Sequence, residues 1–197
     1  MRDADQLWST AIHEASHGAV AVALGAATRA GPISIVGGRS FHGISFVGEP
    51  AKFAKQDIEA ASGVPWVLWP TRLRRNLETR VMVCLAGFAG QDMLAGRGAA
   101  PPLPAAPQRV TLPPREDATL TRAVAQDETQ TDIQQAYTLM RAIHLDDDKL
   151  QTRHLGFLAA QVDALLAAEA GRIVKLAEAL YEARTLPAAR WKQLLAA

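Results

Sequence analysis

Apolar residues near the start of the chain recur at intervals of three and four positions, among residues that favour helices. This spacing places them on one face of an amphipathic helix. The apolar positions are Trp8, Ile12, Ala15 and Ala19. We predict a packed helix from Asp3 to about Leu24, ending at Gly25.

A β-rich stretch comes next. Residues 31–36 and 41–47 alternate partly between apolar and polar positions, and the turn dipeptide Gly37-Gly38 separates them. We predict a hairpin, or two strands of a small sheet. The following mixed stretch around Trp66 and Trp69 gives no clear element.

Helical patterns account for most of the remaining chain. One region opens at Pro70-Thr71 and runs to about Leu94, and another runs from about Asp127 nearly to the end, with breaks at residues 145–148 and near Pro187. Between them, residues 98–116 contain six prolines, which excludes a helix interior. We predict a long loop insertion there, either a lid or a tolerated surface segment.

These elements predict a mainly α-helical α+β fold with a small sheet and a C-terminal helical bundle. We expect residues 1–197 to form one domain, because the chain is 49% hydrophobic and long enough for one substantial core.

Charge and composition exclude several function classes. The 21 Lys and Arg residues nearly balance the 20 Asp and Glu residues, so no summed positive field favours nucleic acid. An arginine cluster at positions 72–80 is interpreted as a solvated helix face. The apolar runs are shorter than the roughly 20 residues of a membrane span, and the start lacks a secretory pattern, so we expect no transmembrane segment and a cytoplasmic location. The single cysteine, Cys84, cannot form an internal disulfide or a multi-cysteine zinc site, and we expect it to pack in the core.

The segment His13-Glu14-Ala15-Ser16-His17 places His-Glu-x-x-His inside the first predicted helix. Histidines four residues apart lie on one helical face, so both imidazoles can bind one metal ion. Zinc lowers the pKa of bound water from about 15.7 to about 7, which makes a nucleophile available near neutral pH. Glu14 is then placed to act as the general base of peptide-bond hydrolysis and to return the proton to the leaving amine.

A catalytic zinc site has three protein ligands, so a third residue must join His13 and His17. The metzincin pattern would need histidine at position 23, where this chain has Ala23, and that subclass is excluded. A downstream glutamate remains open as the third ligand. The candidates are Glu49, Glu59 and Glu78.

Several segments resemble, in order, the protease domain of the FtsH-type (M41) zinc metallopeptidases. The zinc helix is similar over residues 12–19, the strand pair over residues 33–35 and 43–45, and a glycine-containing apolar helix over residues 77–91. Residues 131–137 resemble the helix whose aspartate is the third zinc ligand, and the segments at 164–166, 176–180 and 185–186 resemble the closing helices. The chain departs from the family at Ser16, where glycine is usual, at Thr131, where asparagine is common, and at Gln91-Asp92, in place of an acidic pair.

The resemblance implies that Asp132 is the third ligand of one Zn²⁺ per chain. It implies a peptidase that cleaves unfolded or flexible polypeptides, with extended substrate adding to the sheet edge. No phosphate-binding loop accompanies the motif, so the chain is ATP-independent by itself, and the sequence leaves open a separate ATPase partner and a homo-oligomer.

The sequence is also compatible with two other function classes. A catalytically inactive peptidase fold could serve as a binding or scaffold module, although the intact Glu14 argues against it. A structural zinc protein ranks last, because closed structural sites are usually rich in cysteine. His42, His144 and His154 are assigned no catalytic role, and the turn around residues 144–154 is expected to be solvated rather than a second metal site.

Overall fold

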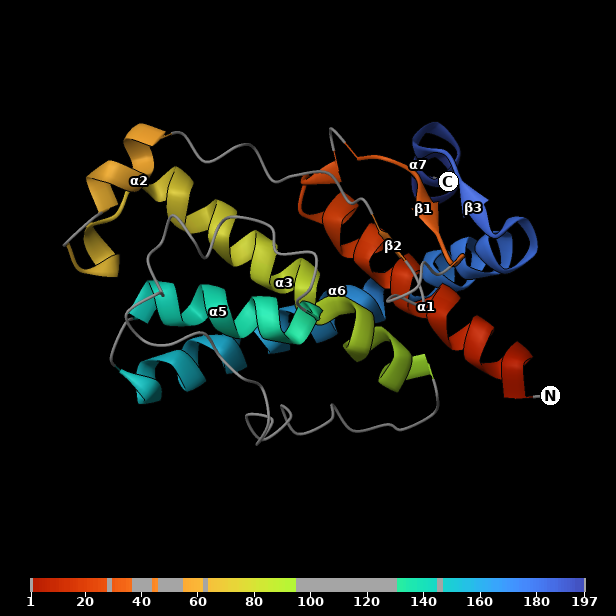
Figure 1. Cartoon of the computed structure of the whole chain (residues 1–197), viewed down its shortest axis with the longest axis horizontal. Helices are drawn as coiled ribbons and strands as arrows, with labels where there is room; N and C mark the ends of the chain where they lie inside the picture. Colours follow the sequence, from red (N-terminus) through yellow and green to blue (C-terminus); the bar gives the residue numbers. More distant parts are fainter. Residues whose placement is uncertain are drawn as a thin grey trace. The chain divides into compact units, whose positions relative to one another are not determined.

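The computed structural model describes residues 2–27, 30–36, 44–45, 55–61, 64–94, 131–144 and 147–196 (Figure 1). The predicted proline-rich loop, His42 and Glu49 lie outside these residues. In chain order the elements are α1 (Arg2–Ala23), β1 (Ile33–Ser34), β2 (Ile44–Ser45), α2 (Lys55–Ala61), the 3-10 helix η2 (Trp66–Leu68), α3 (Thr71–Leu94), α5 (Asp132–His144), α6 (Asp148–Ala183), β3 (Thr185–Leu186) and α7 (Ala188–Ala196). The described residues are mainly helical with one small antiparallel sheet, which confirms the predicted class.

The chain divides into two compact units. The first contains Met1–Glu49, Ala86–Pro101 and Val162–Ala197, and the second contains Pro50–Leu85 and Pro102–Gln161. The expectation that residues 1–197 act as one domain stays a prediction. None of the helices within the described ranges combines the length and apolar character needed to cross a bilayer.

In the first unit, α1 contacts β1, β2 and α7. It ends where predicted, because Gly25 takes a left-handed conformation with φ of 70° that glycine adopts without strain. The small residue Gly18 lets the sheet approach α1: a Cβ there would lie 3.1 Å from Cδ1 of Ile33. Ile33 and Trp191 are fully buried in this core, and the Trp191 indole donates a hydrogen bond to the carbonyl of Gly31 over 3.0 Å.

The sheet has the order β2-β1-β3, with both pairings antiparallel. The predicted pair of strands is confirmed by β1 and β2, where Ile33 lies opposite Ser45. The third strand corrects the expectation of helix at residues 185–186. Arg184, with φ of 65°, turns the chain at the end of α6, and Leu186 then pairs with Ile33.

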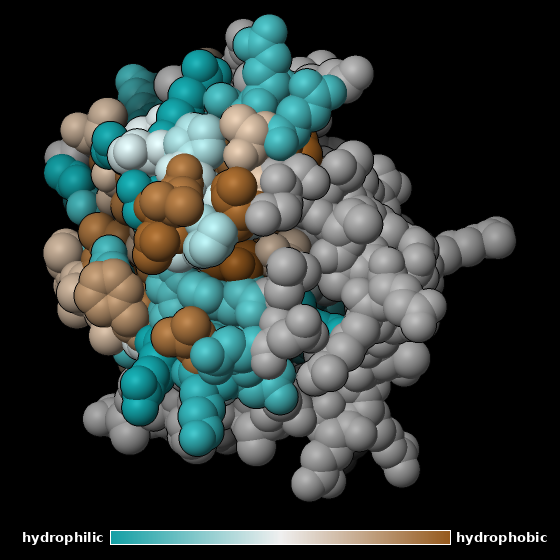
Figure 2. All heavy atoms as spheres, turned by 90° about the vertical axis from the view of Figure 1, so that its left-hand side faces the viewer, coloured by the Kyte–Doolittle hydropathy of each residue, from teal (hydrophilic) through white to brown (hydrophobic). Residues whose placement is uncertain are grey.

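In the second unit, most of the buried side chains come from α3, α5 and the first part of α6. The largest fully buried ones are Leu73, Leu77, Leu139, Met140 and Leu158. Exposed apolar residues near η2 include Val64, Val67 and Leu68, and Figure 2, which views the end that carries α2, shows apolar side chains there among polar ones.

The arginine cluster on α3 is only partly the solvated face that we expected. Arg72 and Arg75 are exposed, whereas Arg80 is buried with 7% of its surface accessible. The positive charge of its guanidinium partly opposes the rise that burial causes in the pKa of the Cys84 thiol. Arg80 therefore belongs to the interior of this unit.

Candidate metal centre

His13 and His17 form the centre of the candidate site in the first unit. They stand one turn apart on α1, with ring centroids separated by 4.7 Å and ring planes inclined by 83°. Their Nε2 atoms face each other at 3.1 Å. Two imidazole nitrogens that each bind zinc at about 2.1 Å can be at most about 4.2 Å apart. The pair already lies within that limit.

The C-terminal part of α3 forms a wall against these rings. A Cβ on Gly87 would lie 2.5 Å from Cε1 and Nε2 of His13 and 2.6 Å from Nε2 of His17. Only a residue without a side chain fits there. The next residue, Phe88, places its ring edge-to-face against His13, with centroids 4.9 Å apart.

A second close approach lies one turn further along α3. A Cβ on Gly90 would clash with the Oγ atom of Ser16, which is fully buried. The Ser16 hydroxyl donates to the carbonyl of Ile12 over 2.7 Å, so its polar atom is satisfied within α1. Ser16, noted above as a departure from the family, is therefore matched by the absence of a side chain at position 90.

Gln91 connects α3 to the same face of α1. Its Oε1 atom lies 3.1 Å from Nδ1 of His13. Its Nε2 atom donates to the backbone carbonyl of Ser9 over 3.0 Å and to the Ser9 hydroxyl over 2.8 Å. The side chain of Gln91 thus reaches the ring nitrogen of His13 that faces away from His17.

Asp132 is the first residue of α5, and a capping box fixes the start of that helix. The Thr131 hydroxyl accepts a hydrogen bond from the backbone N–H of Gln134 over 3.3 Å, and the Gln134 side chain accepts one from the N–H of Thr131 over 2.8 Å. Thr131 is therefore the N-cap residue of α5.

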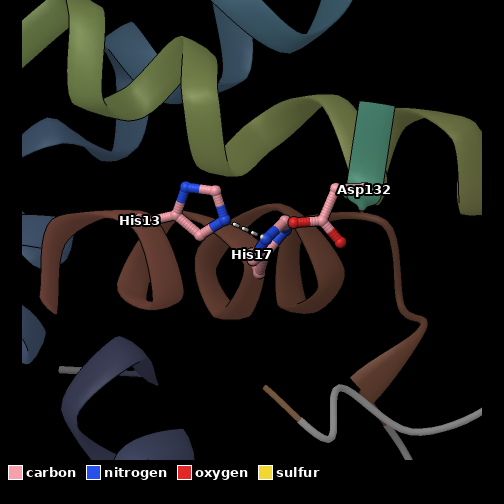
Figure 3. Close-up of side chains that lie close together, drawn as sticks. All are labelled: His13, His17 and Asp132. Carbon is pink, nitrogen blue, oxygen red and sulfur yellow. Dashed lines mark hydrogen bonds between the residues drawn. The ribbon is translucent and has the colours of Figure 1, made fainter. Parts of the chain in front are cut away.

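Ligand atoms of His13, His17 and Asp132 all lie within 4.8 Å of one another (Figure 3). This group could hold a metal ion, and two imidazole nitrogens with a carboxylate oxygen are a donor set that suits zinc and other first-row divalent ions. Asp132 was expected here from the family resemblance alone.

Glu14 lies between the two histidines in the sequence and is 5% exposed. A carboxylate is rarely so buried without a structural or chemical reason. The sequence assigned it the role of general base, and that role stays a prediction.

No protein-family model matches the chain, and no curated protein matches it either. The resemblance to the M41 peptidases therefore stays a prediction that rests on the motifs quoted above.

The alternative third ligands have other places in the second unit. Glu59 is exposed on α2. Glu78 accepts a hydrogen bond from Nε2 of His154 over 3.1 Å, and Nδ1 of His154 lies 2.9 Å from Nε2 of His144. Trp66 packs beside both rings, with centroid distances of 6.2 Å to His144 and 5.7 Å to His154. The two histidines thus form a hydrogen-bonded, partly buried pair that the sequence did not predict, while Asp147 and Asp148 between them are exposed, as expected for a solvated turn.

Cys84 is 5% exposed, and its thiol donates to Oε1 of Gln135 over 3.2 Å. Burial, with a smaller contribution from the Asp132 carboxylate, raises the pKa of this thiol to about 12. The neutral thiol is the stable form, in agreement with the packing role expected from the sequence.

Sequence reasoning missed the contributions of Gly87, Gly90 and Gln91 to the site. A local signal for them exists: positions 87, 90 and 91 are spaced by three and four, so they share one face of a helix. Two glycines on such a face indicate that another backbone or a bulky group approaches closely.

Proposed function

We propose that this chain is a zinc-dependent endopeptidase that cleaves unfolded or flexible polypeptides. The observation that carries the proposal is the opposed pair of Nε2 atoms, 3.1 Å apart on α1, with a carboxylate oxygen of Asp132 in the same 4.8 Å group. The His-Glu-x-x-His spacing gives the same helix a buried carboxylate beside the pair.

In the proposed reaction, His13, His17 and Asp132 would hold one zinc ion through two nitrogens and one oxygen. The ion would supply Lewis acidity and make an attacking water available near neutral pH. The carboxylate of Glu14 would accept a proton from that water, whose oxygen forms the new C–O bond of the acid product. Glu14 would then pass the proton to the departing amine nitrogen as the peptide C–N bond breaks.

The proposal is tested by metal content and by cleavage of an unfolded protein such as casein. We expect about one zinc per wild-type chain and measurable hydrolysis. Glu14→Gln keeps the length of the side chain but removes the base, so zinc should remain while cleavage falls by about 100-fold or more. The exposed Glu178 on α6 provides the matched control, since Glu178→Gln should leave both quantities unchanged.

Asp132 is tested with a second matched pair. Asp132→Asn and Asp148→Asn each remove a carboxylate from the first turn of a helix, so both lose a similar favourable interaction with the helix dipole. Only Asp132→Asn should weaken zinc binding. A wild type that binds zinc but cleaves no substrate, even with an ATPase added, would favour the binding or scaffold module, and a wild type without metal affinity would reject the proposal.

A further inference from the structure

The hydrogen bonds of Gln91 determine which way its amide points. The Nε2 atom lies 3.0 Å from the carbonyl oxygen of Ser9, and a carbonyl oxygen can only accept. In the reversed orientation, two acceptor oxygens would face each other at that distance. The Ser9 hydroxyl, 2.8 Å away, could serve either orientation because it can donate or accept. The backbone carbonyl therefore decides, and it turns Oε1 of Gln91 toward His13.

This orientation has a consequence for the imidazole of His13. Oε1 of an amide carries no hydrogen, so the 3.1 Å hydrogen bond to His13 requires the proton to be on Nδ1. A neutral imidazole has one N–H group, and Nε2 consequently keeps its lone pair. Nε2 is the atom that faces His17 at 3.1 Å.

We infer that Gln91 is a positioning residue that holds His13 in its Nδ1–H tautomer and keeps Nε2 available to bind a divalent metal ion. The role of the metal rests on the proposed function, whereas the tautomer follows from the hydrogen bonds of Ser9, Gln91 and His13 alone. Hydrogen bonds of this kind to the distal nitrogen fix the orientation of metal-binding imidazoles and raise their basicity.

The tautomer of His13 also determines which Nε2 atom carries the proton between the rings of His13 and His17. If Nε2 of His13 has no hydrogen, the 3.1 Å hydrogen bond between the rings requires an N–H at Nε2 of His17. In the metal-free protein, the two histidines then have opposite tautomers. To hold a metal ion through Nε2, His17 would have to transfer its proton to its own Nδ1 or to solvent, whereas His13 would need no change. Gln91 thus prepares one ligand before the ion arrives.

The test is the tautomeric state of His13 in the metal-free full chain, measured by two-bond ¹H–¹⁵N NMR of the imidazoles at about pH 8, where an ordinary histidine is neutral. We expect Nδ1–H at His13 and Nε2–H at His17. Three variants follow: Gln91→Met has similar length but no amide oxygen, Gln91→Glu keeps an acceptor, and Ser9→Ala removes the hydroxyl but keeps the carbonyl. Gln91→Met should lose the Nδ1–H preference of His13, and Ser9→Ala should retain it. Gln91→Glu should retain it in part, because it keeps an acceptor for His13 but loses the donor to the Ser9 carbonyl.

Zinc affinity, measured by competition with a chromophoric chelator, gives a second readout. Gln91→Met should weaken binding by about 10- to 100-fold, and Gln91→Glu should restore part of the loss. Circular dichroism confirms that each variant is folded, and the wild-type spectrum tests the inference even if Gln91→Met does not fold.

An Nε2–H tautomer at His13 in the wild type would overturn the inference. So would a folded Gln91→Met variant with unchanged tautomer and zinc affinity. A wild type with the expected tautomers but no zinc affinity would instead reject the proposed function while leaving the hold of Gln91 on His13 intact. The two failures are therefore distinguishable.

Discussion

Gly87→Ala should disable the proposed metal centre while changing the fold little. The added methyl group would lie 2.5 Å from Nε2 of His13 and 2.6 Å from Nε2 of His17, roughly 0.9 Å closer than the 3.4 Å at which ordinary contact begins. Either the imidazoles or α3 must move. If the two rings each move by about 0.9 Å in opposite directions, the separation of their Nε2 atoms grows from 3.1 Å to about 4.9 Å. That exceeds the roughly 4.2 Å limit for two nitrogens that share one zinc ion.

If α3 retreats instead, the Gln91 side chain moves with it. A shift of about 0.9 Å would lengthen the 3.1 Å bond from Gln91 to His13 to about 4 Å, beyond hydrogen-bond range. Both routes disturb His13, so we expect zinc affinity to fall by at least about 10- to 100-fold, the usual cost of losing an outer-shell partner.

The stability of the metal-free protein should change much less. Replacing a helical glycine by alanine stabilises a helix by about 0.5–1 kcal/mol, while overpacking costs about 1–3 kcal/mol. The free energy of unfolding should therefore fall by about 0–2.5 kcal/mol, measured by urea denaturation without metal. Gly171 on α6 is the matched control, because an added Cβ meets nothing within 4 Å. Gly171→Ala should gain about 0.5–1 kcal/mol and keep full zinc affinity.

The contrary result is a Gly87→Ala variant that binds zinc within about twofold of the wild type and is stabilised to the same extent as Gly171→Ala. That result would mean that α3 does not approach the histidines as closely as 2.5 Å.

Three further predictions concern other contacts. Gly90→Ala should lower the free energy of unfolding by about 1–3 kcal/mol, because the added methyl group clashes with Ser16. In a double-mutant cycle measured by urea denaturation, adding Ser16→Gly should recover much of this loss, and additive effects of the two substitutions would contradict the contact. Cys84 should react with a thiol reagent at pH 8 at least about 100-fold more slowly in the native state than in urea. A pKa of about 12 instead of 9.0 lowers the thiolate fraction, and burial limits access of the reagent; a native rate within tenfold of the unfolded rate would refute this. Burial and the neighbouring His154 lower the pKa of His144 below 6.5, so the native state disfavours its protonation. The stability that its neutral form contributes is complete above about pH 6.5 and is lost as the pH falls from there toward the lowered pKa. His144→Asn should flatten the decline of the unfolding free energy below pH 6.5, and an unchanged slope would be the contrary result.

The sequence was sufficient for the long helices because their signals are local, whereas the short helices α2 and η2 lie in the stretch where it predicted no element. The apolar period of α1, the start of α3 at Thr71 and the breaks on either side of α6 agree with the structure to within a few residues. In contrast, β3 is two residues long and becomes a strand only by pairing with Ile33 and Ser34, some 150 positions earlier in the chain. No local pattern encodes such a pairing, because two residues carry no periodicity.

The candidate site likewise contains residues that the sequence could bring together and residues that it could not. His13 and His17 could be paired from sequence, since helix geometry alone brings residues four apart onto one face. Gln91 could not, because an amide side chain is an ordinary feature of a helix surface until its partners are known. The bonds that define it cross 78 and 82 positions of sequence, to His13 and Ser9.

The glycines of α3 combine a local helical spacing with long-range contacts to α1. Glycine weakens a helix interior by about 0.5–1 kcal/mol relative to alanine, so two of them on one face destabilise α3 considered in isolation. At Gly87 and Gly90, the absent side chains leave space that the rings of His13 and His17 and the hydroxyl of Ser16 occupy. Close approach of the backbone then brings Gln91, next to Gly90, within 3.1 Å of His13. The helical spacing of Gly87, Gly90 and Gln91 thus forms a second pattern complementary to His-Glu-x-x-His. The Gly87 variant tests whether the proposed metal centre requires the close approach, and the Gly90 variant tests the contact of α3 with Ser16.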